Sequence, residues 1–64
     1  MDRAAGMSRL PGAYGFALFL RDAGLDDEAI AVRLGIEPSA ARNLLVLAER
    51  KLAILIDNHD ASGR

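Results

Sequence analysis

Apolar positions recur at helical spacing in three stretches of the chain. These stretches predict helices over residues 11–23, 27–34 and 39–56. Gly24 and Gly35 follow the first two stretches, and glycine in a left-handed conformation commonly ends a helix. The chain is therefore expected to be all-α, with three helices of which the third is long.

Local signals mark where the predicted helices begin. Pro11 and Pro38 suit the first helical position, where the missing N–H of proline is not needed. Asp26 is placed to cap the second helix, and Asp27 and Glu28 follow in its first turn. Carboxylates are favoured there by the helix dipole, so we interpret this acidic run as a capping signal rather than a metal site.

The polar and apolar pattern also divides the chain. Residues 1–9 show no clear period and predict a flexible N-terminal arm, residues 10–56 the folded domain, and residues 57–64 a flexible polar tail. Arg3 and Arg9 are candidates for contact with a phosphate backbone. The alternative is that they belong to a disordered terminus.

The segment 27–46 has the spacing of a helix-turn-helix. Ala31 is small where two helices cross, Gly35 lies in the turn, and Ile36 is expected to fill the core beneath the turn. Ala41 and Leu44 follow on the inner side of the next helix. A helix-turn-helix presents one exposed helix to the DNA major groove.

The long third helix has two neighbouring apolar stripes when it is unrolled at about 100° per residue. The first stripe suffices to pack against the other helices and consists of Ala41, Leu45, Ala48, Leu52, Leu55 and Ile56. The second stripe consists of Ala40, Leu44, Leu47 and Ile54. Together they span an arc of about 200°, about twice what one buried face needs. We predict that the second stripe is a homodimer interface; the alternative is that the first helix covers more of the third helix.

The remaining face of the third helix carries residues suited to DNA. Arg42 can bind guanine with two hydrogen bonds, Asn43 can bind adenine in the same way, and Val46 can contact a thymine methyl group. Arginines on either side can hold phosphates. The residues predicted to contact DNA are Ser39, Arg42, Asn43, Val46, Arg33 and Arg50.

Composition narrows the classes of function. At 64 residues the chain holds one small domain, and without cysteine it has no disulfide and no thiolate metal site. The single histidine, His59, lies in the polar tail, so we predict neither a metal, a cofactor nor an enzyme. The formal charge of −1 is lower than that of a strongly basic DNA-binding protein. No segment has the length of a membrane span, and a cytoplasmic, nucleoid-associated protein is expected.

The chain resembles the C-terminal, region 4-like domain of bacterial sigma factors and, less closely, the LuxR/GerE-type DNA-binding domain. The matching segments are LPGAY at 10–14, FLRDAGL at 19–25, EAIAVRLGI at 28–36 and AERKL at 48–52. The resemblance implies that the third helix reads a promoter element through Ser39, Arg42, Asn43 and Val46. The family commonly has basic residues where this chain has Leu44 and Leu47, and Glu37 replaces its usual Ser or Thr cap.

Two functions follow as hypotheses. The first is a dimeric helix-turn-helix regulator of transcription that binds double-stranded DNA. The second is a protein-interaction adaptor that contacts RNA polymerase, a sigma factor or another regulator and does not bind DNA. The low charge and the apolar third helix favour the second.

Overall fold

The computed structural model of the chain describes residues 2–62, with side chains as far as residue 57. In this part of the chain there are four helices and no strand: α1 (Arg3–Arg9), α2 (Ala13–Asp22), α3 (Asp27–Leu34) and α4 (Pro38–Ser62). The all-α prediction is confirmed. The side chain of His59 and residues 63–64, which belong to the predicted tail, lie outside the described part.

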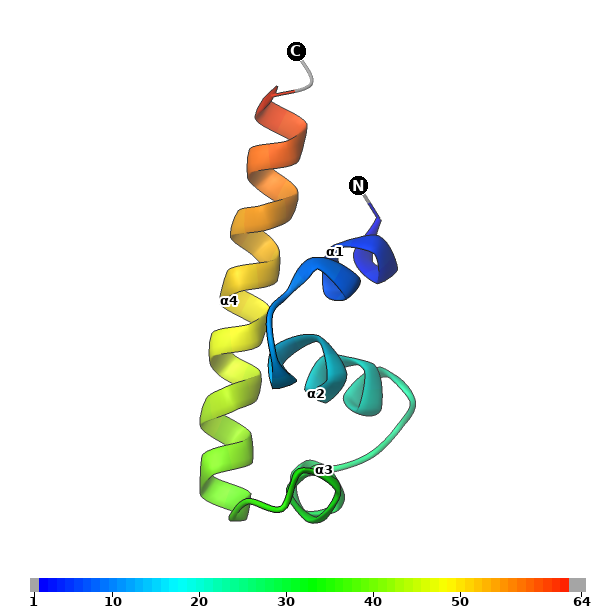
Figure 1. Ribbon diagram of the computed structural model, residues 1–64, viewed down its shortest axis with the longest axis vertical. Coiled ribbons are helices and arrows are strands. Elements are labelled where there is room, and N and C mark those ends of the chain that lie inside the picture. The colour runs from blue at the N-terminus through cyan, green and yellow to red at the C-terminus, as the bar shows by residue number, and fades with distance from the viewer. Residues whose placement is uncertain (1, 63–64) are drawn as a thin grey trace.

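The helix α4 is a rod that sets the 41 Å length of the molecule. In Figure 1, α1 and α2 lie along one side of α4, and α3 lies near its N-terminal end. The axis of α3 is seen almost end-on in this view, so it crosses the direction of α4 steeply. The C-terminal end of α4 projects beyond the other helices (Figure 1).

The helix α3 has the bounds that its local signals predict. The side chain of Asp26 accepts a hydrogen bond of 2.9 Å from the backbone N–H of Ala29, which confirms it as the cap. At the other end Gly35 is left-handed, with φ of 70°. The backbone N–H of Ile36 donates to the carbonyl of Ala31 at 3.0 Å, and that of Gly35 to Val32 at 3.2 Å. These two bonds form a Schellman motif, which ends the helix and starts the turn.

The first nine residues differ from the predicted flexible arm, because most of them form α1. The side chain of Asp2 caps this helix by accepting a 2.7 Å hydrogen bond from the N–H of Ala5. Gly6 and Met7 are buried against the rest of the molecule. A seven-residue helix is too short to be stable alone, so its packing, rather than its own sequence, accounts for it.

The helix α2 begins two residues later than predicted, at Ala13. Gly12 precedes it with φ of 54°, a left-handed value that no residue inside an α-helix adopts. Pro11 is therefore not the first helical residue; it lies in the connection from α1. The carbonyl of Pro11 accepts a 3.3 Å hydrogen bond from the N–H of Tyr14.

The core lies where α1, α2 and α3 meet α4. Within α4, the residues 41, 45, 48 and 52 of the first stripe are at most 3% exposed, while residues 55 and 56 are half-buried. The other buried apolar residues are Met7, Ala17, Leu18, Leu20, Ile30 and Ala31. Ile36 does not fill the core as predicted, because it remains 38% exposed at the turn.

The helix α4 extends through residues 57–62, which were expected to be a flexible tail. No glycine or proline interrupts the sequence between Pro38 and Ser62. Polar residues such as Asp, Asn and Ser are only moderately unfavourable inside a helix, so a helix that is already formed can continue through them.

Arg3 joins three helices through a cluster of ion pairs. Its Nε lies 2.8 Å from Oδ2 of Asp22 on α2, and its Nη2 lies 2.9 Å from Oε2 of Glu49 on α4. Arg21 also pairs with Glu49. The hydrogen bond from Arg3 lowers the pKa of Asp22, and the same bond raises the pKa of Arg3. Arg3 is therefore held against the body of the molecule and does not belong to an extended basic arm.

Candidate nucleic-acid interface

The N-terminal half of α4 has one buried face and one open face. The buried face packs under α2 and α3 through Ala41, Leu45 and Ala48. On the open face, all the residues that were predicted to touch bases or phosphates are exposed: Ser39, Arg42, Asn43, Val46 and Arg50. Because α4 is one unbroken rod, these residues are held on a rigid support.

Arg42 is not isolated on this open face. Its Nε donates a 3.2 Å hydrogen bond to Oδ2 of Asp27 in the first turn of α3. The side chain of Arg42 is 64% exposed and that of Asp27 is 39% exposed. The guanidinium group has five N–H donors, so this contact leaves its two terminal amino groups available to another acceptor. No signal in the sequence identifies this pair, because 15 positions and a turn separate the two residues.

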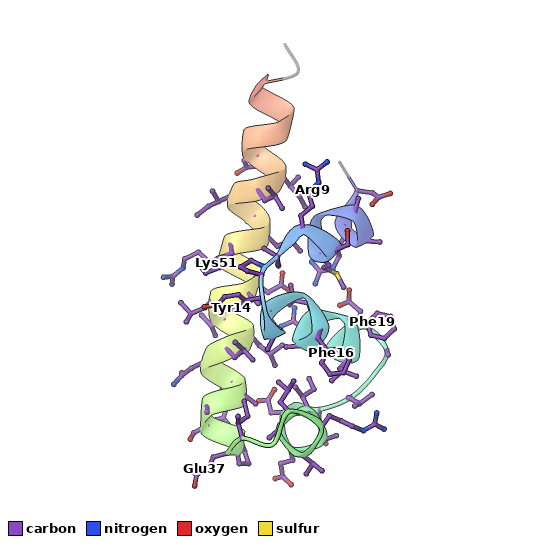
Figure 2. All side chains as sticks on the ribbon, in the orientation of Figure 1. Arg9, Tyr14, Phe16, Phe19, Glu37 and Lys51 are labelled. Atoms are coloured by element: carbon purple, nitrogen blue, oxygen red, sulfur yellow. The ribbon has the colours of Figure 1, made fainter. Side chains whose placement is uncertain are left out.

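The charge around the open face is mixed. Arg33 is exposed in the last turn of α3, and Arg50 is exposed further along α4. Glu28 and Glu37 are also exposed, and Figure 2 places Glu37 at the N-terminal end of α4. Carboxylates at this end of α4 repel anions, so they oppose the binding of a polyanion to the open face. Glu49 does not add to the negative charge of the open face, because it is half-buried in the ion-pair cluster.

The second apolar stripe of α4 stays largely uncovered by the chain itself. Leu47 is 43% exposed and Ile54 is 54% exposed, while Ala40 is exposed and Leu44 is half-buried. The additional helix α1 does pack on α4, but it leaves Leu47 and Ile54 open to solvent. Lys51 also falls on this stripe. Its position fits because residues 40, 44, 47, 51 and 54 are separated by four and three positions in turn. Its ammonium lies 5.3 Å from the centre of the Tyr14 ring (Figure 2).

A second apolar surface lies between α1 and α2, and sequence analysis missed it. Phe16 is 48% exposed and Phe19 is 60% exposed, and Figure 2 shows both side chains beside α2 and separate from α4. They border an open groove of about 340 Å³. Its lining consists of Ala4, Met7, Ser8, Leu10, Gly12, Gly15, Phe16 and Phe19. The groove escaped prediction because one of its walls is the unexpected helix α1.

Comparison with protein-family models, with curated proteins and with solved structures finds no match to this chain. Among residues 2–62, no helix is both long enough and apolar enough to cross a membrane. The arguments about function therefore rest on the geometry of this molecule.

Proposed function

We propose that the chain is a small transcriptional regulator that inserts the N-terminal half of α4 into the major groove of double-stranded DNA, as a homodimer. One observation carries the proposal: α4 exposes Arg42 and Asn43 on one face while its opposite face is buried under α2 and α3. In this reading α3 and α4, joined by the turn at Gly35, act as a helix-turn-helix of the kind found in region 4 of sigma factors. Such a regulator acts in the cytoplasm, on the nucleoid.

The chemistry of each side chain assigns it a role in the complex. Arg42 binds guanine, Asn43 binds adenine, and Val46 rests against a thymine methyl group, while Ser39 contacts either a base or a phosphate. Arg33 and Arg50 hold phosphates on the two sides of the groove. With so few phosphates neutralised, affinity is expected to be modest and salt-sensitive, and the slope of log affinity against log salt is expected to be that of a few phosphate contacts.

Fluorescence anisotropy with duplex DNA at low salt tests this function. A duplex selected by the wild-type chain from a library with a randomised centre serves as the probe. Arg42→Ala and Asn43→Ala are each expected to lower discrimination between bases by about 5- to 150-fold without unfolding the protein. Arg9→Ala is the matched control, since Arg9 is an exposed arginine on α1 that is a candidate for a phosphate contact only, and its loss is expected to leave the discrimination between bases unchanged. If the wild type selects and binds no duplex at low salt, the proposal is wrong.

The homodimer is proposed on the exposure of the second stripe. Leu47 and Ile54 are one heptad apart, which suits helix-on-helix packing around a twofold axis. A dimer places two reading helices on half-sites about 34 Å apart or a multiple of that distance. Leu47→Glu with Ile54→Glu is expected to give a monomer in light scattering. Val46→Glu with Ala53→Glu is the control, because it adds the same charge to exposed positions of α4 outside the stripe. A monomeric wild type at micromolar concentration contradicts the dimer.

The apolar groove between α1 and α2 favours a second candidate function. Two phenylalanines at 48% and 60% exposure on a small domain are typical of a contact with another protein. The chain would then be an adaptor for RNA polymerase, a sigma factor or another regulator, and would not bind DNA. Titration with purified RNA polymerase separates the candidates. The adaptor binds it through the groove and loses affinity on Phe19→Ser, whereas the DNA-binding regulator keeps its affinity for the selected duplex in this variant.

A further inference from the structure

Asp27 has a contact that its place at the start of α3 does not require. Asp26, and not Asp27, caps the helix by accepting the N–H of Ala29. Glu28 already supplies a carboxylate in the same first turn. The carboxylate of Asp27 instead reaches across the turn to α4, where Oδ2 accepts from Nε of Arg42 at 3.2 Å.

This contact limits where the guanidinium of Arg42 can point. The group is planar, so a hydrogen bond at Nε fixes one edge and directs the fork of the two terminal amino groups away from Asp27. Arg42 remains 64% exposed, so the fork is open to solvent on the outer side of α4. The O6 and N7 atoms of guanine in the major groove are two acceptors that match such a fork.

We propose that Asp27 is a positioning residue that holds Arg42 for guanine, so the DNA read by this chain contains a guanine opposite Arg42. The inference rests on the proposed DNA-binding function. It adds the base that the chain prefers and the residue, Asp27, that causes the preference. Asp27 does not touch the DNA. It acts by holding Arg42 in the orientation that binding requires, which reduces the freedom lost when the complex forms.

Removal of the Asp27 carboxylate has two effects that a measurement can separate. Loss of a negative charge near the phosphates raises affinity for every sequence. Release of Arg42 from Asp27 does not act on every sequence; it lowers only the preference for guanine over the other bases. The ratio of affinities for two duplexes that differ at one base cancels the first effect and reports the second.

The experiment compares the duplex selected by the wild-type chain with the same duplex in which the guanine opposite Arg42 is replaced by adenine. Anisotropy titrations are made with the wild type and with Asp27→Ala, Asp27→Asn and Glu28→Ala. A bidentate arginine–guanine pair typically discriminates about 5- to 150-fold, and Asp27→Ala is expected to reduce this ratio by about 5-fold or more. Asp27→Asn keeps an acceptor oxygen and is expected to retain most of the ratio.

Glu28→Ala is the matched control, since it removes the same charge from the same turn and leaves the contact to Arg42 in place. It is expected to raise affinity for both duplexes and to keep their ratio. Asp27→Ser replaces Asp27→Ala if urea unfolding shows that the alanine variant is not folded. If no duplex is selected, the proposed function and this inference both fail. If a duplex is bound but no guanine matters, or if Asp27→Ala keeps the full ratio, only this inference fails.

Discussion

Gly15 lies where α2 packs directly against the backbone of α1, and Gly15→Ala is expected to destabilise the intact chain. Gly15 lies inside α2, where its backbone is helical. A β-carbon added there would overlap the carbonyl oxygen of Met7 and lie 3.3 Å from its carbonyl carbon. Because these are backbone atoms, α1 has to shift as a unit to make room.

The expected change in the free energy of unfolding on Gly15→Ala follows from two opposing effects. In an unhindered helix interior, replacing glycine by alanine stabilises by about 1 kcal/mol. Forcing an extra methyl group into a packed contact costs about 1–3 kcal/mol. If α1 detaches instead, the exposure of Met7, now 9% exposed, costs about 1.5–3 kcal/mol. The net change in the intact chain is therefore a loss of up to about 2 kcal/mol.

Urea unfolding followed by circular dichroism, in a double-mutant cycle, isolates the clash. Gly15→Ala is made in the intact chain and in a chain that begins at Leu10 and so lacks α1. The truncated chain is expected to gain about 1 kcal/mol from the substitution, because no carbonyl opposes it. The coupling between the two changes is then about 1–3 kcal/mol. Equal effects of Gly15→Ala in both chains, within about 0.5 kcal/mol, would refute the packing of α1 against α2.

Two further substitutions test the turn and the ion-pair cluster. Gly35→Ala is expected to cost about 1 kcal/mol in urea unfolding, and Gly35→Asn less, because φ is 70° and an added β-carbon meets no atom within 4 Å. Equal effects of the two would contradict a left-handed cap. Asp22 has a lowered pKa in the folded state, so its contribution is present above its ordinary value of 3.8 and is lost as pH falls through the folded value. Because Asp22 and Arg3 are each more than 40% exposed, the contribution is at most about 1 kcal/mol. Asp22→Asn is expected to flatten this part of the acid unfolding curve, and an unchanged curve would show that the pair adds no stability.

The parts of the fold that were predicted correctly have signals that are local in sequence. The helix α3 is an example, because its cap at Asp26 and its left-handed Gly35 are both set by residues within one turn of its ends. The helix α1 has no such signal beyond Asp2. It persists because Gly15, which in sequence looks only like a weak helix former, admits the backbone of Met7.

The candidate site likewise has some features that the local sequence predicts and others that it does not. The period of α4 suffices to place Arg42 and Asn43 opposite the buried stripe. The ion pairs that the side chains of α4 form, in contrast, join residues that are far apart in the sequence. Asp27 reaches Arg42 across 15 positions, and Arg3 reaches Glu49 across 46. The helical period does not report such contacts, so it gives no sign that Glu49 is half-buried, and Arg3 was predicted to lie in a flexible arm.

The two proposed interfaces of α4 occupy neighbouring sides of one rod. Val46 and Leu47 are adjacent residues, so their side chains point about 100° apart around the helix. A second copy seated on Leu47 and Ile54 would leave Val46 and Arg42 open, while Asn43, four residues before Leu47, lies at the border of the two faces. Since α4 continues without a break from Pro38 to Ser62, the proposed dimer contact would fix the direction in which that face points. In the proposed dimer, two linked reading faces would raise the affinity for DNA without additional basic residues, and so would offset the formal charge of −1.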